Sequence, residues 1–329
     1  LDAFDDPAVG AARQADQLEV DEFGANVRET AQPDVELRED LRRVVDAGAK
    51  PDEIDAHPAI TEALARAMAL DETHLDARYG TPAWTDTRSF VFGDAIIFGY
   101  EQGVERLYQD ARKLAWADEG LPPQPVQQGR RATIVLGAPA SGKSGFSNRI
   151  AQQRGAALID ADEAKKSLIE FENGVGANAV HEESVDLAQL MLQRAVSNGD
   201  NVVLPRTGAN PKSVQKALTS LKEMGYEVDL VLVSVPVDEA YRRNILRFID
   251  TGRLVPPAYI RNVVGDNPAS TYNTFKSKAN RHAEIDNSGP QSSPKPVSNT
   301  SADNPLEGID LRLRDTTSGS GRGVREVGA

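Results

Sequence analysis

The segment Ile134–Ser144 constrains the fold of this chain more strongly than any other stretch. It reads IVLGAPASGKS, an apolar run that stops at Gly137 and is followed by Gly142-Lys143-Ser144 at the start of an expected helix. The spacing G-x-x-x-x-G-K-S is typical of a strand–loop–helix turn that wraps a phosphate group. Amides of such a loop and the positive end of the helix attract an anion, and the glycines allow its close approach. The pattern therefore predicts a nucleotide-binding loop made of Gly137, Ala138, Pro139, Ala140, Ser141, Gly142, Lys143 and Ser144.

The residue types at the end of this loop indicate which nucleotide it serves. The lysine at position 143 can reach the β- and γ-phosphates, and the hydroxyl of Ser144 can bind Mg²⁺. We therefore expect ATP and Mg²⁺ as cofactors. A chance match in a Gly/Ser-rich turn is the alternative, but the strand and helix patterns on either side favour the functional interpretation.

From Arg131 onward, apolar strands alternate with amphipathic helices. The expected strands cover residues 132–136, 156–160, 201–204, 227–235 and 283–285, and the expected helices cover 143–153, 162–171, 181–197, 211–224 and 237–249. Strands that are apolar throughout indicate a parallel sheet covered by helices on both faces, which is an α/β fold. Such sheets bind ligands at the carboxyl ends of their strands, where the nucleotide-binding loop begins.

Composition excludes several classes of function. The chain has no cysteine and only four scattered histidines, so disulfides and thiolate–metal sites are excluded and a zinc site is not expected. No segment approaches the roughly 18 apolar residues of a membrane span, and we expect no membrane partner. Residues 1–128 include 27 acidic and 12 basic residues, whereas residues 129–329 include 23 acidic and 25 basic residues. This balance argues against a duplex nucleic-acid partner, because such proteins present a basic face.

The same asymmetry predicts a modular chain. Residues 1–33 are polar and acidic and are expected to form a flexible arm. Residues 34–128 are expected to form an acidic helical region, with helices at 34–47, 58–70 and 95–116. Residues 129–288 form the expected nucleotide-binding domain, and residues 289–329, rich in Ser, Gly and Pro, are expected to be a disordered tail. We expect a cytoplasmic location, in the producing cell or in a target cell if the protein is delivered as an effector.

Two carboxylates follow the second expected strand, in Asp160-Ala161-Asp162. At the carboxyl end of a strand beside the loop, they can bind Mg²⁺ or take a proton from a hydroxyl group. Strand alternation does not say which aspartate has which role. Asp162 can also serve as a cap for the helix that follows.

Basic residues after the later strands are further candidates. Arg243 and Arg247 share a helix face, and Arg253 lies in an expected lid; arginines there can neutralise charge on a transferred phosphoryl group. A solvated basic helix face would give the same pattern. The segment Arg206-Thr207-Gly208 follows the third strand and either lines the pocket or only forms a turn. Ser184 lies near His181 at the start of a long helix, without the sequence context of a Ser/His hydrolase.

The order of these motifs resembles that of the zeta toxins, a family of P-loop kinases. The resemblance covers roughly residues 131–288 and rests on the nucleotide-binding loop, the aspartate pair, the helix containing Ser184, Thr207-Gly208 and the lid arginines. It implies an α/β fold with a P-loop kinase-like parallel sheet flanked by helices, here preceded by an α-helical N-terminal region.

The resemblance also implies roles for individual residues. Lys143 and Ser144 would hold ATP and Mg²⁺, with Asp160 as a second metal ligand. Asp162 matches the general base that takes the proton from a sugar hydroxyl. Arg247 and Arg253 match arginines that contact the triphosphate and, with Lys143 and Asp162, complete the catalytic set. The residues expected to bind the substrate are Lys165, Ser184 and Thr207.

The acceptor implied by the resemblance is the 3′-hydroxyl of UDP-N-acetylglucosamine, whereas related effectors of plant pathogens phosphorylate the ribose of NAD. This chain departs from the family pattern on the acceptor side, at Pro205-Arg206 and at Gln189. We expect the UDP-N-acetylglucosamine reaction. The alternatives are an NAD ribose kinase, a regulatory nucleotide-binding module without transfer, and a polynucleotide end kinase.

Zeta toxins are restrained by a small helical antitoxin, and some related toxins carry inhibitory helices in the same chain. A separate antitoxin or the acidic residues 1–128 could therefore cover the nucleotide site here. The alternative hypothesis is that residues 1–128 are a stabilising or targeting extension. Charge asymmetry alone does not separate the two hypotheses.

Overall fold

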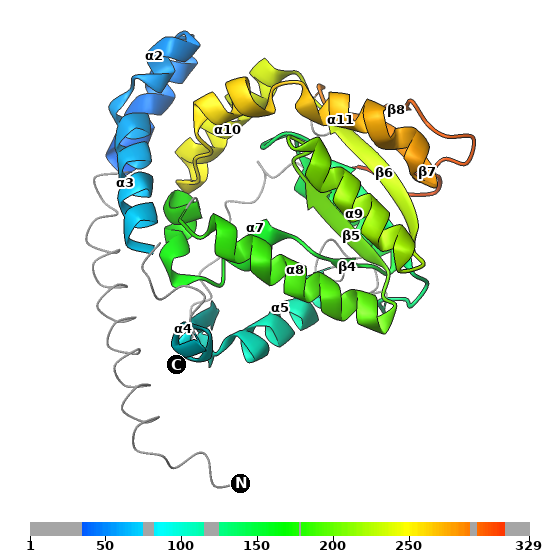
Figure 1. Ribbon diagram of the computed structural model, residues 1–329. Coiled ribbons are helices and arrows are strands. Elements are labelled where there is room, and N and C mark those ends of the chain that lie inside the picture. The colour runs from blue at the N-terminus through cyan, green and yellow to red at the C-terminus, as the bar shows by residue number, and fades with distance from the viewer. Residues whose placement is uncertain (1–34, 75–81, 115–124, 178, 290–294, 313–329) are drawn as a thin grey trace, which may run out of the picture.

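The computed structural model describes residues 35–74, 82–114, 125–177, 179–289 and 295–312 (Figure 1). The strands of the central sheet are ordered β4-β5-β3-β6-β7-β8. The first five in this order run parallel, and β8 is antiparallel to β7. Their bounds are β3 Arg131–Leu136, β4 Ala157–Leu158, β5 Val202–Arg206, β6 Glu227–Ser234, β7 Arg281–Asp286 and β8 Val297–Ser298.

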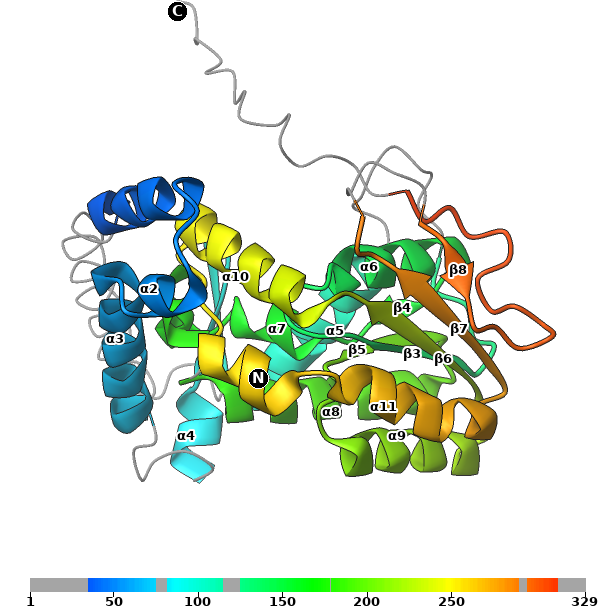
Figure 2. The same cartoon turned by 90° about the horizontal axis from the view of Figure 1, so that it is seen from above.

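Helices cover both faces of this sheet, as the apolar strands predict. In Figure 2, α6 (Lys143–Arg154) lies on one face, and α8 (His181–Asn198), α9 (Pro211–Glu223) and α11 (Asn267–Phe275) lie on the other. Strand alternation assigns side chains to these two cores. Ile134 packs in the core beneath α8 and α9, whereas its neighbour Val135 packs with residues of α6. The predicted α/β class and parallel sheet are confirmed.

The helix ends follow from local sequence. The side chain of Asn210 caps α9 by accepting hydrogen bonds from the amides of Lys212 and Ser213, and Pro211 occupies the first turn. α6 and α8 end at Gly155 and Gly199, whose positive φ angles provide left-handed caps.

The N-terminal helices pack beside α10 (Val237–Thr251), as Figures 1 and 2 both show. They are a helix over residues 35–46, α2 (Pro51–Asp55) and α3 (Pro58–His74). Leu41 and Ile60 are fully buried in one apolar cluster with Phe248 of α10. The remaining elements are α4 (Pro82–Thr87), α5 (Tyr100–Leu114), α7 (Ala161–Lys165) and the irregular turns η1 (Ile169–Ala177), η2 (Tyr259–Val264) and η3 (Lys276–Lys278).

A β-hairpin replaces the first turn of the helix expected over residues 95–116. Strands β1 (Ser89–Phe92) and β2 (Ala95–Phe98) pair antiparallel around Gly93, and α5 begins only after Gly99. Both glycines have positive φ, which breaks a helix and suits a tight turn. The expectation was wrong for residues 95–98 because an apolar pair at positions 96 and 97 fits a strand as well as a helix. The end of the expected helix, residues 115–116, lies outside the described residues.

Contacts in the structure cross two of the module boundaries expected from the sequence, and the modules themselves stay a prediction. Phe90 and Leu107 are buried in the same core as Ile134, so part of the expected acidic helical region packs with the expected nucleotide-binding domain. Within the expected disordered tail, β8 pairs with β7, and Leu306 is buried against the α6 face of the sheet. The paired strand and the buried leucine hold the described part of this segment, residues 295–312, against the sheet. The expected arm, residues 1–33, lies outside the described residues.

Across the described residues, each helix is too short or too polar to cross a lipid bilayer.

Candidate active site

The nucleotide-binding loop connects β3 to α6 and has the conformation that its glycines permit. Gly142 has a φ of +83° directly before α6. A side chain at Gly137 would place its Cβ 2.6 Å from Ser141 Oγ and 2.9 Å from the carbonyl oxygen of Val233. The loop is held from outside by Asn287, whose Nδ2 donates a hydrogen bond of 2.7 Å to the Ser141 carbonyl. Asn287 follows β7 and belongs to no motif, so this contact could not be predicted from the sequence.

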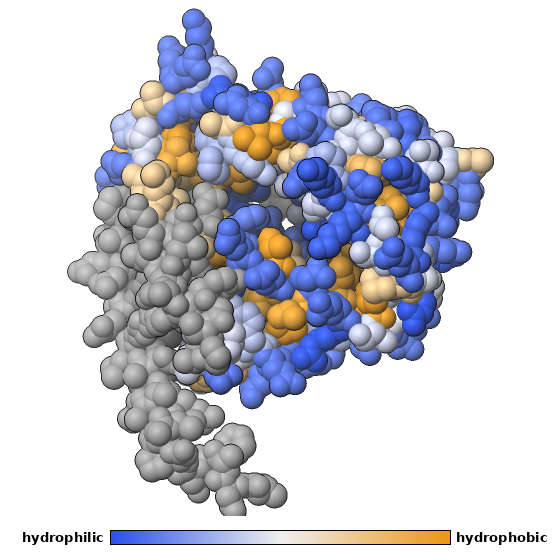
Figure 3. Space-filling view, in the orientation of Figure 1, coloured by the Kyte–Doolittle hydropathy of each residue, from blue (hydrophilic) through white to orange (hydrophobic). Residues whose placement is uncertain are grey.

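A cavity of about 290 Å³ opens beside this loop at the carboxyl ends of the strands. Figure 3 shows a largely hydrophilic face that is hollowed near its centre, in the same orientation as Figure 1. Four residues predicted from the sequence line the cavity: Lys143, Asp160, Asp162 and Thr207. Its other polar lining residues include His181, Gln189, Arg206, Asn210 and Ser213.

The two aspartates differ in environment although they are two residues apart. Asp160 is buried at the start of α7, where its Oδ1 accepts a hydrogen bond of 3.0 Å from the Asp162 amide. Burial, together with repulsion from Asp162, raises the pKa of Asp160 to about 6. Asp160 is therefore the N-cap of α7, the role that the sequence offered to Asp162.

Asp162 is held by two cations. Its Oδ2 lies 2.6 Å from Nη2 of Arg253, and its Oδ1 lies 3.3 Å from Nζ of Lys165. Burial opposes ionisation of this carboxyl, but the attraction of Arg253 and then Lys165 outweighs it and holds its pKa well below the usual range. Burial lowers the pKa of Lys143 and of Lys165.

The lid arginines are fixed by the end of α10 and the loop after it. Arg247 Nη2 donates a hydrogen bond to Oδ1 of Asn244. The Asn244 side chain also fixes the backbone of Val255, because its Nδ2 donates to the Val255 carbonyl and its Oδ1 accepts from the Val255 amide. Arg253 packs so closely on Gly174 that a Cβ there would lie 2.6 Å from the arginine Cβ. Burial, and then repulsion from Arg253, lowers the pKa of Arg247 to about 10. The Nε atoms of both arginines are buried without a hydrogen-bond partner in the described part of the chain.

Ser184 is placed differently from the other expected substrate residues. It is fully buried, its hydroxyl donates to the carbonyl of His181, and it is not among the residues that line the cavity. Lys165 also lies behind the cavity lining and reaches the site through Asp162. His181 lies in the lining itself, and burial and the nearby Lys165 lower its pKa.

The residues expected to bind Mg²⁺ fit a magnesium site. Asp160 supplies a buried carboxylate that accepts a hydrogen bond from the Asp162 amide, and Ser144 supplies an exposed hydroxyl on the first turn of α6. Magnesium sites for nucleotides commonly use one or two protein oxygens and complete their shell with phosphates and water. Within the described residues there is no cluster of three or more His, Cys, Asp or Glu side chains that could hold a metal alone.

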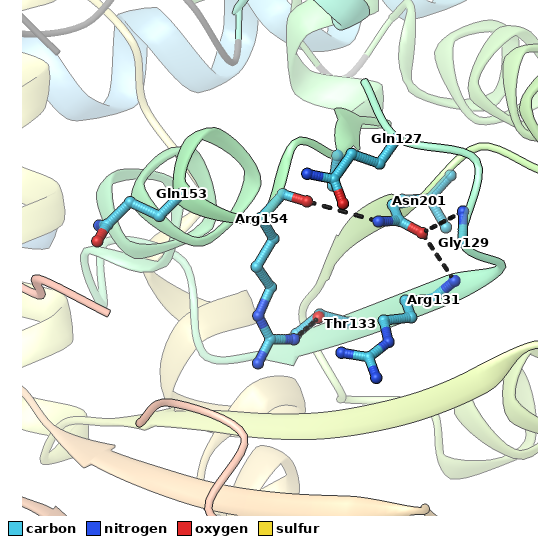
Figure 4. A pocket seen from close by; sticks show the side chains of 9 residues that line it. Gln127, Gly129, Arg131, Thr133, Gln153, Arg154 and Asn201 are labelled. Carbon is cyan, nitrogen blue, oxygen red and sulfur yellow. Dashed lines mark hydrogen bonds between the residues drawn. The ribbon is translucent and has the colours of Figure 1, made fainter. Parts of the chain in front are cut away.

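A second cavity, of about 260 Å³, lies at the opposite end of the sheet (Figure 4). Its polar groups bond mainly to one another. Asn201 Oδ1 accepts hydrogen bonds from the amides of Gly129 and Arg131, and Arg154 donates to Thr133 Oγ1 and to Asp229. Because these polar groups already have hydrogen-bond partners, we interpret the cavity as a packing gap between the amino ends of the strands and not as a binding site.

The chain has distant likenesses among solved structures. It is 15% identical to a protein of the PezAT chromosomal toxin–antitoxin system of Streptococcus pneumoniae, with 58% of this chain and 79% of the other covered at a TM-score of 0.46. It is 18% identical to a chain of the AvrRxo1-ORF1:-ORF2 complex with ATP, covering 66% and 73% at a TM-score of 0.45. Shikimate kinase from Aquifex aeolicus vf5 is 19% identical, covering 48% and 87% at a TM-score of 0.29.

No curated protein matches the chain. A family model described as Zeta toxin matches residues 118–288, slightly more than half of the chain. The matched region contains the nucleotide-binding loop, the aspartate pair and the lid arginines. The chain therefore belongs to the Zeta toxin family.

Proposed function

We propose that this protein is an ATP-dependent kinase that transfers the γ-phosphoryl group of ATP to a hydroxyl group of a small molecule. The observation that carries the proposal is the meeting of Lys143, Asp162 and Arg253 beside a cavity at the end of the nucleotide-binding loop. Membership of the Zeta toxin family supports kinase activity in general. The identity of the acceptor molecule is a separate and more specific proposal.

ATP binding would use groups that have few partners in the structure. The loop amides and Lys143 would hold the β- and γ-phosphates, and the orphaned Nε atoms of Arg247 and Arg253 would donate to the triphosphate. Ser144 and Asp160 would hold Mg²⁺, which supplies charge neutralisation on the phosphate oxygens when bound.

Asp162 is the proposed general base. Its carboxylate takes the proton of the acceptor hydroxyl as that oxygen bonds to the γ-phosphorus, the bond between that phosphorus and the β–γ bridging oxygen breaks, and ADP leaves. In this structure Arg253 neutralises the carboxylate, which makes it a weak base. A triphosphate that draws Arg253 away would raise the basicity of Asp162, so that nucleotide binding prepares the base.

The proposed acceptor is the 3′-hydroxyl of UDP-N-acetylglucosamine, with the ribose of NAD as the alternative in the same family. Gln189 and Thr207 offer neutral hydrogen-bonding groups in the cavity lining that suit a sugar. Incubation with ATP and Mg²⁺ and each of UDP-N-acetylglucosamine, NAD and oligonucleotide ends, read by mass shift, tests the proposal. A gain of one phosphoryl group on a small molecule supports it. Transfer to oligonucleotide ends alone, or to none of these, contradicts it.

A helical antitoxin remains a proposed partner, and cis restraint by residues 1–128 remains a prediction. The described contacts of the first helix and of α2 favour the alternative role, a stabilising extension. Arg38 donates to the carbonyl oxygens of Phe248 and Ile249 at the end of α10, and Asp55 bonds Tyr241 and Arg261. These contacts lie on α10 and η2 rather than among the residues that line the cavity, and those on α10 would support the helix that carries Arg247.

A further inference from the structure

Arg206 lies at the acceptor side of the cavity. It is the last residue of β5, and its carbonyl accepts a hydrogen bond from the amide of Gly137, which fixes its backbone beside the nucleotide-binding loop. Strand alternation puts it on the same face as Leu204, which packs in the core under α8 and α9. Val203 points to the opposite face, toward α6. The Arg206 side chain is therefore directed to the α8–α9 wall of the cavity, away from the face that α6 covers.

The guanidinium of Arg206 has no hydrogen-bond or ion-pair partner in the part of the chain that the structure describes. No hydrogen bond or ion pair joins its side chain to any described residue, whereas Arg253 and Arg154 each have a carboxylate within 2.7 Å. Burial lowers the pKa of Arg206, and the negative charge of Asp160 partly opposes this effect. Arg206 is half-buried in the cavity wall, and its five N–H donors are available to a ligand that supplies acceptors.

The surroundings of Arg206 suit an anion. The neighbouring lining groups on this wall are Thr207 and, from the first turn of α9 and its cap, Asn210 and Ser213. The only carboxylates among the lining residues are Asp160 and Asp162. The positive end of the 13-residue α9 adds to the field of the guanidinium.

We infer that Arg206 is a specificity residue that binds a phosphate or carboxylate group of the acceptor, so that the enzyme selects anionic acceptors. This inference rests on the proposed kinase function. A guanidinium binds either group through two parallel hydrogen bonds, which a lysine ammonium does not reproduce. The anion can belong to the diphosphate of a nucleotide-linked acceptor or to a small phosphorylated or carboxylated polyol.

The test compares acceptors that differ only in the anionic group. The pairs are N-acetylglucosamine 1-phosphate with N-acetylglucosamine, and glycerate with glycerol. UDP-N-acetylglucosamine and NAD are tested as well, as acceptors whose anionic group is the diphosphate of a nucleotide. Initial rates at saturating ATP should show that wild-type protein prefers the anionic member of a pair. Arg206→Gln should raise KM for that member by about 10- to 100-fold, the loss expected for a charged hydrogen-bonded pair, and leave KM for ATP unchanged. Arg206→Lys should recover part of the loss.

The matched control is Arg312→Gln, because Arg312 is an exposed arginine paired with Asp310 far along the chain from the site. Equal use of charged and neutral acceptors by wild type and Arg206→Gln would overturn the inference, as would a rise in KM for ATP alone. If wild-type protein phosphorylates no acceptor, the proposed function fails, but the role of Arg206 is still decided by calorimetry. Binding of N-acetylglucosamine 1-phosphate that is lost in Arg206→Gln and kept in Arg312→Gln supports the assignment, and its absence in wild type overturns it.

Discussion

Arg253 Nη2 lies 2.6 Å from Oδ2 of Asp162, so the proposed base and a proposed triphosphate-binding arginine are paired with each other. The two residues come from separate parts of the fold, the start of α7 and the loop after α10. Their contact joins the acceptor side of the cavity to the nucleotide side. The contact gives a physical reason why ATP would bind before the proton transfer. Asp162 becomes a stronger base only when Arg253 pairs with another anion, such as the triphosphate.

Asp162→Asn should abolish transfer while ATP still binds. Asparagine cannot take the hydroxyl proton, and loss of a general base costs about 10²–10⁴-fold in rate. Phosphorylated product measured by mass spectrometry and binding of a fluorescent ATP analogue separate the two effects. Near-normal turnover in this variant would show that Asp162 is not the base.

Ser144→Ala and metal removal should act on the same step. Chelation of Mg²⁺ by EDTA should stop transfer, and restored Mg²⁺ should recover it, because the metal neutralises the phosphate charge. Ser144→Ala should raise the Mg²⁺ concentration needed for half-maximal rate, since one hydroxyl ligand is lost. Ser197→Ala, which removes an exposed hydroxyl near the end of α8 and outside the cavity lining, is the matched hydroxyl control. An unchanged Mg²⁺ requirement in Ser144→Ala would remove Ser144 from the metal site.

Arg38→Met should lower both thermal stability and kcat severalfold. Its charged hydrogen bonds to the last carbonyls of α10 are worth about 1.5–3 kcal/mol, and their loss would loosen the helix that carries Arg247. Arg43→Met removes an exposed arginine of the same helix, paired locally with Asp40, and is the control. A gain in kcat for Arg38→Met would instead favour restraint by the N-terminal region.

Arg88→Met should destabilise the protein by about 3–5 kcal/mol, because it leaves buried carboxylates without their partner. Arg88 is buried and bonds Glu183 and Glu170, which ties the segment entering the β1–β2 hairpin to α8 and η1. Urea denaturation measures the change in the free energy of unfolding. Glu183→Gln together with Arg88→Met should cost less than the two single changes combined. A strictly additive result would show that the pair is not coupled.

Stability should fall as pH rises from about 10 to 12, in part through Tyr226. Burial raises the pKa of Tyr226 to about 12, so the unfolded phenol, which ionises near pH 10, loses its proton first. The contribution of the neutral phenol is thus present below pH 10 and lost as pH approaches 12. Tyr226→Phe should flatten this part of the pH profile of the midpoint of urea denaturation. An identical slope in the variant would contradict the assignment.

The sequence by itself determined the class of fold and the nucleotide loop. The largely apolar runs at residues 132–136 and 227–235 are typical of strands that are buried on both faces, which predicts the α/β sheet. The spacing from Gly137 to Ser144 is typical of a phosphate-binding loop. Each of these features depends on residues that are close together in the sequence. The same local reasoning led to the wrong element at residues 95–98, where an apolar pair fits two periodicities and the partner strand Ser89–Phe92 decides between them.

The tertiary structure decided every feature that depends on contacts between residues far apart in the sequence. Asn287 supports the loop, Ser184 turns inward, and Arg253 pairs with Asp162, because packing of the sheet, α8 and α10 brings these residues to their positions. No spacing in the sequence encodes such contacts, since they join segments separated by tens of residues. For the same reason, only the tertiary structure shows that Arg206 lines the cavity and does not merely form a turn, and that its side chain has no partner among the described residues.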